Sequence, residues 1–124
     1  MTPEAAYSSS RSGELLLIDV RRPTEWEKTG IAETAVPLTM HGENGVAGLI
    51  QSLESLVAGD KSKPIAVICR SGTRSARVSK ALLDHGFTQV HDVSEGMIGN
   101  FVKRGWIKRG LPTKPTTKDD EPKS

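Results

Sequence analysis

The sequence predicts one α/β domain in which a parallel β-sheet carries helices on both faces. Short continuous apolar runs alternate along the chain with segments whose apolar residues recur at helical spacing, and this alternation is typical of parallel sheets. The 124 residues are enough for one domain with a sizeable core. We expect the domain to span residues 1–112. Residues 113–124 contain no large apolar side chain and are predicted to form a flexible polar tail.

The apolar runs predict the strands of the sheet. Runs that are short, continuous and rich in β-branched residues are typical of buried parallel strands. Two such runs are strong, at residues 15–20 and 64–68. A weaker strand is predicted near residues 35–36, where Pro37 ends it, and another at residues 89–93.

Capping signals and apolar spacing predict the helices. Proline is favoured at the first helical position, and glycine commonly follows the last. Trp26 is expected to face inward from the second helix. The helices are predicted at residues 2–7, 23–30, 46–59, 75–85 and 97–102.

The only cysteine of the chain, Cys69, follows the predicted strand at residues 64–68. It lies in a short polar loop that begins the next helix. Ligands of α/β proteins bind beyond the carboxyl ends of the strands, and the free N–H groups of a helix start attract anions. With Arg70 and Arg74 nearby, these groups favour the thiolate. Cys69 is therefore predicted to be a nucleophile, although a lone cysteine after an apolar strand is also commonly a small core residue.

Composition excludes several classes of protein. The formal charge is +2, from 17 basic and 15 acidic side chains, so no strong field for nucleic acid or a membrane is expected. The basic segment at residues 103–109 is interpreted as a solvated helix end. Because the three histidines have no metal-ligand spacing with Cys69, we expect no metal and no other cofactor. The start of the chain lacks the features of a signal peptide, and we expect a cytoplasmic protein.

Several short motifs occur together in this chain. They are residues 2–5, residues 18–21 with Pro23, Glu25 and Trp26, the loop Cys-Arg-Ser-Gly-Thr-Arg-Ser at residues 69–75, and residues 86–87, 95–97 and 110–112. Together they resemble a rhodanese-like domain of the single-domain thiosulfate sulfurtransferase family. The resemblance spans residues 1–112. It departs at residues 29–35, where the family commonly reads Gly-His-Ile-Pro-Gly-Ala and this chain lacks the histidine and the second glycine.

The resemblance implies a sulfurtransferase. Such an enzyme moves a sulfane sulfur from thiosulfate or another persulfide donor to a nucleophilic acceptor through a persulfide of Cys69. The implied partners are small-molecule donors and acceptors, such as thiosulfate, cyanide or thiols, with a protein as a further candidate acceptor. Neither a nucleic acid nor a membrane is expected as a partner.

The resemblance also implies a role for each residue of the loop. The loop amides would surround the anionic terminal sulfur, and Gly72 would permit a positive φ. Arg70 would meet the dianionic donor, and Arg74 would donate to loop carbonyls or to a carboxylate, with Asp19 as its expected partner. Asp19 and Arg21 would support the loop, Arg21 more as a salt-bridge residue than as a substrate contact. The expected substrate-binding residues are Arg70, Ser71, Gly72, Thr73, Arg74 and Ser75.

Two alternatives remain open. Protein tyrosine phosphatases and arsenate reductases also use a cysteine in an anion cradle, but the phosphatases have five residues between cysteine and arginine. Cys69 and Arg74 enclose four, so the cradle is smaller. The other alternative is a non-catalytic sulfur carrier or docking module. The presence of Cys69 favours a catalyst or a carrier over a docking unit.

Overall fold

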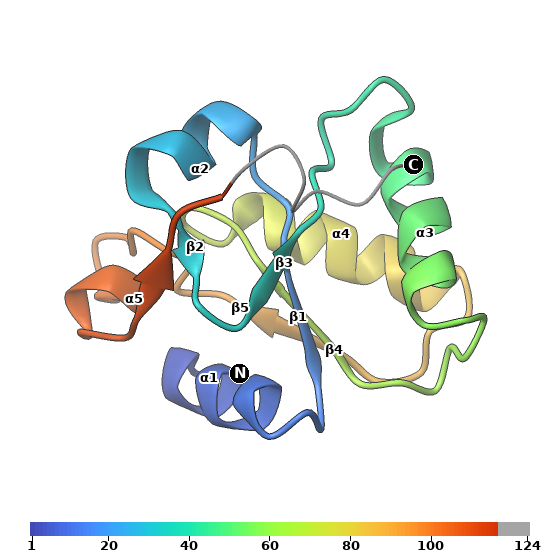
Figure 1. Cartoon of the computed structure of the whole chain (residues 1–124), viewed down its shortest axis with the longest axis horizontal. Helices are drawn as coiled ribbons and strands as arrows, with labels where there is room; N and C mark the ends of the chain where they lie inside the picture. Colours follow the sequence, from blue (N-terminus) through green and yellow to red (C-terminus); the bar gives the residue numbers. More distant parts are fainter. Residues whose placement is uncertain (117–124) are drawn as a thin grey trace.

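Strand β1 lies in the middle of a parallel sheet with the order β3-β1-β4-β5. The computed structural model describes residues 1–116, and Figure 1 shows the sheet between two layers of helices. The strands of the sheet are β1 (Leu16–Asp19), β3 (Ala35–Pro37), β4 (Ile65–Ile68) and β5 (Val90–Val93). The helices are α1 (Pro3–Arg11), α2 (Pro23–Thr29), α3 (Gly45–Leu56), α4 (Thr73–Asp84) and α5 (Gly105–Lys108).

The register brings the carboxyl ends of the strands to one edge of the sheet. Asp19 at the end of β1 lies opposite Pro37 of β3 and Ile68 of β4, and Ile68 lies opposite Val93 of β5. The segments that follow these strands therefore meet at this edge. Cys69, directly after β4, is among them.

Side chains alternate between two hydrophobic cores, one on each face of the sheet. Ile18, Val67 and Cys69 belong to the core that α3 and α4 cover. Leu17 and Ile68 point the other way, into a core that contains Ala6 of α1, Trp26 of α2 and Trp106 of α5. The prediction of a parallel sheet with helices on both faces is confirmed.

Most predicted elements are confirmed, and one helix is wrong. Residues 97–102 form turns and loop, and the last short helix, α5, begins only at Gly105. The apolar side chains of Phe101 and Val102 face solvent, so they provide no buried helix face. The N–H groups of Met97 and Ile98 donate instead to the carbonyls of Cys69 and Arg70.

Regular structure extends beyond Pro112. Thr113 and Lys114, which the sequence places in the flexible tail, form β6 (Thr113–Lys114). This strand pairs antiparallel with β2 (Ile31–Ala32), whose backbone groups are free of the main sheet. The remainder of the predicted tail, residues 117–124, lies outside the described residues. Within residues 1–116, no helix has the length and apolar character needed to span a membrane.

Candidate active site

The loop after β4 wraps around the sulfur of Cys69. The backbone N–H groups of Gly72 and Ser75 donate to Sγ at 3.1 and 3.3 Å. The Ser75 hydroxyl lies 3.4 Å from Sγ and donates to the carbonyl of Gly72 at 3.1 Å. Converging N–H donors stabilise negative charge on a thiolate. The loop therefore supplies the anion-binding geometry that the sequence predicts around Cys69.

Gly72 allows the chain to turn from this loop into α4. Its φ is +114°, in the left-handed region that favours glycine. A Cβ at this position would collide with the carbonyl oxygen of Ser94. Alanine would therefore be strained twice, by its backbone conformation and by contact with the next segment.

Residues 94–98 pack against the loop and hydrogen-bond to its backbone. The N–H of Met97 donates to the Cys69 carbonyl at 2.8 Å, and the N–H of Ile98 donates to the Arg70 carbonyl at 3.0 Å. Gly96 permits this contact because a Cβ there would overlap the Arg70 carbonyl. The nucleophile is thus held by backbone groups from a segment after β5.

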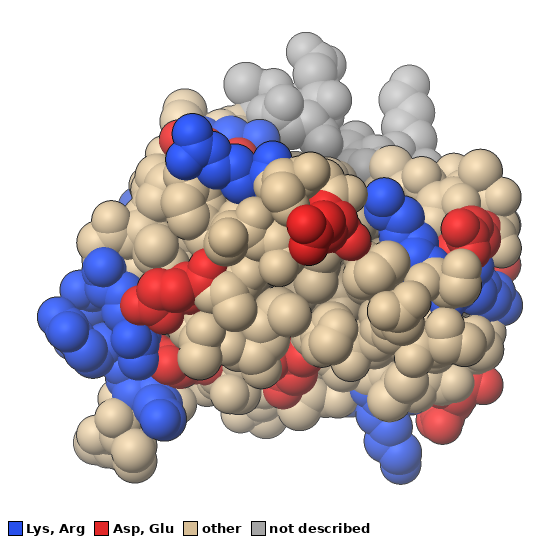
Figure 2. Space-filling view, turned by 90° about the horizontal axis from the view of Figure 1, so that it is seen from below, with Lys and Arg blue, Asp and Glu red and all other residues tan. Residues whose placement is uncertain are grey.

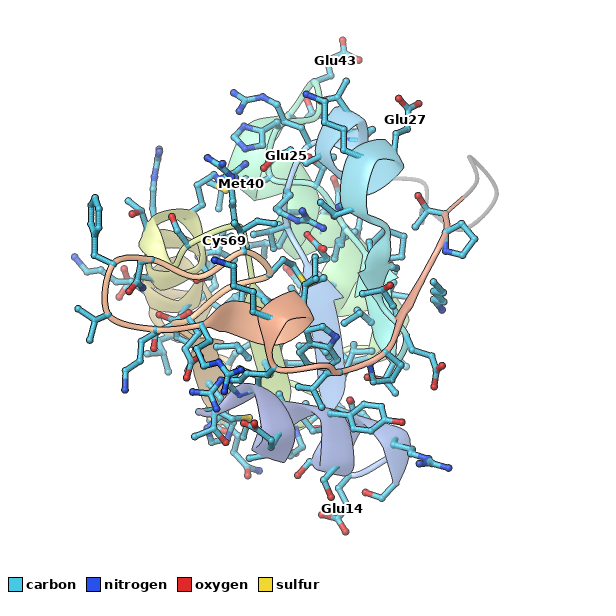
Figure 3. The ribbon with its side chains drawn as sticks, turned by 90° about the vertical axis from the view of Figure 1, so that its left-hand side faces the viewer. Glu14, Glu25, Glu27, Met40, Glu43 and Cys69 are labelled. Carbon is cyan, nitrogen blue, oxygen red and sulfur yellow. The ribbon has the colours of Figure 1, made fainter. Side chains whose placement is uncertain are left out.

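Arg74, in the first turn of α4, pairs with Glu25 of α2. Its two terminal nitrogens donate to Oε1 and Oε2 at 2.6 and 2.7 Å, and Oε1 also accepts the N–H of Arg22 at 3.1 Å. Hydrogen bonds from Arg74 lower the pKa of Glu25 to about 2, against the opposing effect of burial. The pair fastens the start of α4 to α2. In Figure 3 Cys69 and Glu25 lie toward the middle of the molecule, whereas Glu27 points outward.

The expected partnership between Arg74 and Asp19 is wrong. Asp19 is fully buried and binds Arg21, two residues along the chain, through Nε and Nη2 at 2.9–3.1 Å. Arg21 is itself 1% exposed and also donates to Thr29 and to the Gly30 carbonyl. Arg21 is a salt-bridge residue, as predicted. The pair holds the carboxyl end of α2, and its support of the loop is indirect, through the helix that carries Glu25.

Cys69 is more buried than expected. The sequence predicts a nucleophile in a polar loop beyond a strand end, where ligands bind, but the residue is 1% exposed. Its sulfur lies beneath the loop amides, and its side chain belongs to the core on the α3 and α4 side. In the same loop, Arg70, Ser71 and Thr73 are exposed and Ser75 is buried. Only small reagents are expected to reach the thiol without movement of the loop.

A cavity of about 410 Å³ adjoins the loop through Arg70. It is lined by Arg21, Glu25, Lys28, Thr29, Arg70 and Ile98. Arg21 and the Glu25 carboxylate are already paired, so Lys28 and Arg70 are the cations available to a ligand. Neither Lys28 nor Glu25 is among the site residues predicted from the sequence. Both lie on one face of α2, at positions 25 and 28, and this i, i+3 spacing is the signal that could have indicated them.

His41 and Asp92 lie at the borders of the site. His41 Nε2 is 3.3 Å from a terminal nitrogen of Arg74. Burial, followed by the neighbouring cations Arg22 and Arg74, lowers the pKa of His41. Burial raises the pKa of Asp92. The Oδ1 atom of Asp92 is buried without a hydrogen-bond partner among the described residues.

Comparison with known proteins identifies the family. Residues 2–99 match the Rhodanese-like domain. The chain is 34% identical over 99 residues to "Thiosulfate sulfurtransferase 16, chloroplastic" of Arabidopsis thaliana, covering 78% of both chains. It is 30% identical over 99 residues to a protein named "Sulfurtransferase" of Allochromatium vinosum, covering 80% of this chain and 78% of the relative. The chain belongs to the rhodanese-like family.

Solved structures agree with this assignment at the level of the fold. A crystal structure of thiosulfate sulfurtransferase from Pseudomonas aeruginosa superimposes with a TM-score of 0.76 and 21% identity, covering all of this chain and 21% of that one. Together with the relatives named sulfurtransferases, the family match supports a rhodanese-type sulfurtransferase. This class of enzyme implies two substrates, a sulfur donor and a sulfur acceptor.

Proposed function

We propose that this protein transfers sulfane sulfur from thiosulfate, or from another persulfide donor, to a nucleophilic acceptor through a Cys69 persulfide. The observation that supports the proposal most is the pair of N–H groups directed at Sγ, at 3.1 and 3.3 Å. These donors favour a thiolate before the reaction and an anionic sulfur after it. The name of the Arabidopsis relative includes thiosulfate, which supports that donor here.

The reaction proceeds in two displacements. The Cys69 thiolate attacks the outer sulfur of thiosulfate, the bond between the two thiosulfate sulfurs breaks, and sulfite leaves with the electron pair. Cyanide or a thiolate then attacks the outer sulfur of the persulfide. The bond to Sγ breaks and its electron pair restores the Cys69 thiolate, so that no external oxidant or reductant is needed.

The charged groups around the loop have separate roles in this proposal. Arg70 and Lys28 line the cavity and are exposed, so they can attract the dianionic donor and the departing sulfite. Arg74 is engaged with Glu25 and keeps the loop in place. Ser71 and Thr73 contribute through the backbone of the loop, whereas Ser75 also places its hydroxyl beside the sulfur. A reducing compartment such as the cytoplasm would keep this thiol active.

The mass of the intact protein tests the proposal. Incubation with thiosulfate and no acceptor should add about one sulfur atom, and cyanide or a thiol should then remove it. Cys69→Ser should abolish the adduct while the thermal melting curve stays close to that of the wild type. Absence of an adduct after treatment with thiosulfate, glutathione persulfide and a loaded cysteine desulfurase would refute the proposal.

A further inference from the structure

Residues 99–105 form a finger that projects beside the cysteine loop. Its base is closed by Gly99 and Gly105, whose φ values are +87° and +84°. A Cβ on Gly105 would collide with the backbone of Gly99, and a Cβ on Gly99 would lie 2.5 Å from the carbonyl oxygens of Lys103 and Arg104. The two ends of this loop therefore meet backbone to backbone at its base.

The tip of the finger is a defined turn. The side-chain oxygen of Asn100 accepts the N–H groups of Val102 and Lys103, each at 2.9 Å. The N–H of Asn100 donates to the Lys103 carbonyl at 2.9 Å. Three hydrogen bonds thus fix the backbone that carries Phe101. The backbone at Phe101 is thus ordered before any partner binds, and contact with a partner has to order only the side chain.

The turn presents apolar side chains to solvent. Phe101 is fully exposed, and Val102 is 85% exposed. Neither side chain contributes to the two cores of the domain. Scattered exposed apolar residues are common, but an aromatic on a rigid support is typical of a contact residue in protein interfaces.

The surroundings of the tip are basic. The sequence has no acidic residue between Glu95 and Asp119. Lys103, Arg104 and Lys108 are exposed, and none of them forms an ion pair within residues 1–116. Arg109 differs, because Glu95 and Glu4 hold its guanidinium. Figure 2 shows basic side chains gathered at the left of the molecule, the side on which α5 lies in Figure 1.

A groove connects the finger with the cysteine loop. It has a volume of about 430 Å³ and is lined by Ser71, Ile98, Gly99, Asn100, Phe101 and Lys108. Ser71 lies two residues after Cys69, and the backbone of Ile98 is bonded to Arg70. A chain segment that contacts Phe101 therefore lies beside the loop that holds the reactive sulfur.

We propose that the finger and its groove dock an acidic protein segment whose own cysteine exchanges sulfur with Cys69. This inference rests on the proposed function. Apolar residues of the segment pack on Phe101 and Val102, and its Asp and Glu side chains meet Lys103, Arg104 and Lys108. The segment's thiolate attacks the outer sulfur of the Cys69 persulfide, the S–S bond breaks, and Cys69 leaves as the thiolate.

The observations favour a protein over a nucleic acid. Single-stranded nucleic acids bind along extended basic grooves with several stacking aromatics. Here the exposed cations of the finger and α5 are few, and the net charge of the chain is only +2. The tip instead combines an aromatic with an aliphatic side chain, as protein interface cores do.

Synthetic peptides with one central cysteine test the docking. An acidic peptide rich in Asp, Glu and Leu is compared with its Asn/Gln counterpart and with a Lys counterpart. The protein is loaded with thiosulfate, freed of excess donor and mixed with each peptide, and mass spectrometry follows the sulfur. We expect the acidic peptide to react fastest, Phe101→Ser to slow it about five- to tenfold, and Lys103→Gln with Lys108→Gln to slow it about threefold.

The controls separate docking from chemistry. Leu83→Ser removes a 52% exposed apolar residue from the end of α4 remote from Cys69, and it should leave all rates unchanged. Transfer to cyanide should be equal in the wild type and in every finger variant. Binding of the acidic peptide with serine in place of cysteine, followed by fluorescence anisotropy, needs no sulfur transfer and therefore stays informative if the proposed function fails.

The outcomes are distinct. Faster transfer to the acidic peptide, lost in Phe101→Ser but kept in Leu83→Ser, supports the docking. Equal rates for the three peptides, or equal loss in both variants, overturn it. Tighter binding of a single-stranded RNA 20-mer than of the acidic serine peptide also overturns it. Failure of the wild type to take sulfur from any donor refutes the proposed function, and the anisotropy measurement then decides the docking separately.

Discussion

Replacement of Glu25 by Gln should loosen the cysteine loop and lower both stability and turnover. The pKa of Glu25 is lowered from 4.5 to about 2. At 1.36 kcal/mol per pKa unit, this shift limits the contribution of the ion pair to the free energy of unfolding to about 3.4 kcal/mol. Because the side chains of Arg74 and Glu25 are 23% and 21% exposed, solvent screens the pair and we expect about 1 kcal/mol. For a domain of this size, that loss lowers the Tm by about 4 °C.

The pH dependence provides a second measure of the same pair. The folded-state pKa is depressed, so the stabilisation is present above the unfolded value of 4.5 and is lost as the pH falls from 4.5 to about 2. The difference in Tm between the wild type and Glu25→Gln should therefore shrink over this interval. Turnover should fall about tenfold, because Arg74 no longer holds the first turn of α4 in register.

A double-mutant cycle completes the test. Glu25→Gln and Arg74→Gln should each lower the free energy of unfolding by about as much as the double variant does, which corresponds to a coupling energy of about 1 kcal/mol between the two side chains. Glu27→Gln, an exposed change on the same helix, should alter stability by less than about 0.5 kcal/mol. Loss of turnover in Arg74→Gln at an unchanged Tm would reject a structural role and point to contact with the substrate.

Three further predictions concern other parts of the site. Gly72→Ala should lower the free energy of unfolding by about 2 kcal/mol or more, because of the positive φ at this position and the carbonyl beside it. Gly59→Ala, with open space around its Cβ, should lower it by less in the same denaturant titration, and equal losses would contradict the packing argument. Burial raises the pKa of Asp92, so its carboxylate opposes folding above that pKa. Asp92→Asn should therefore raise the Tm at pH 7, by an amount that shrinks toward pH 4. The exposed Asp84→Asn is the control, and a lower Tm for Asp92→Asn would refute the argument. Because Cys69 is 1% exposed, the ratio of the modification rate in the native protein to that in the unfolded chain should be higher for iodoacetamide than for a bulky aromatic disulfide. Equal ratios for the two reagents would mean that the loop opens freely.

The sequence allows the main features of the fold and loop to be predicted because they depend on local signals. The run before Cys69 is continuous and apolar, and Gly72 with the following helical spacing defines a strand, loop and helix in that order. Burial of both faces follows from the same runs. The position of the nucleophile is thus predicted from one stretch of about twenty residues.

Features that depend on three-dimensional neighbours could not be predicted in the same way. The sequence correctly suggests a carboxylate partner for Arg74, but Asp19 is already bound by Arg21, its close neighbour on the chain. The available carboxylate is Glu25, 49 residues away from Arg74. The helix predicted at residues 97–102 fails for a similar reason, because backbone donors of that segment serve the cysteine loop. Strands of two residues, such as β2 and β6, are too short to give a periodic pattern.

The burial of Cys69 has a consequence for how long the loaded enzyme would persist. These 124 residues contain one cysteine, so they supply no second thiol that could displace the bound sulfur and release it as hydrogen sulfide. Under the proposed function, the persulfide would decay only when an outside nucleophile enters beneath the loop. Its lifetime would then be set by the concentration and size of the acceptor, and bulky cellular thiols that do not dock beside the loop would discharge it slowly even when they are abundant.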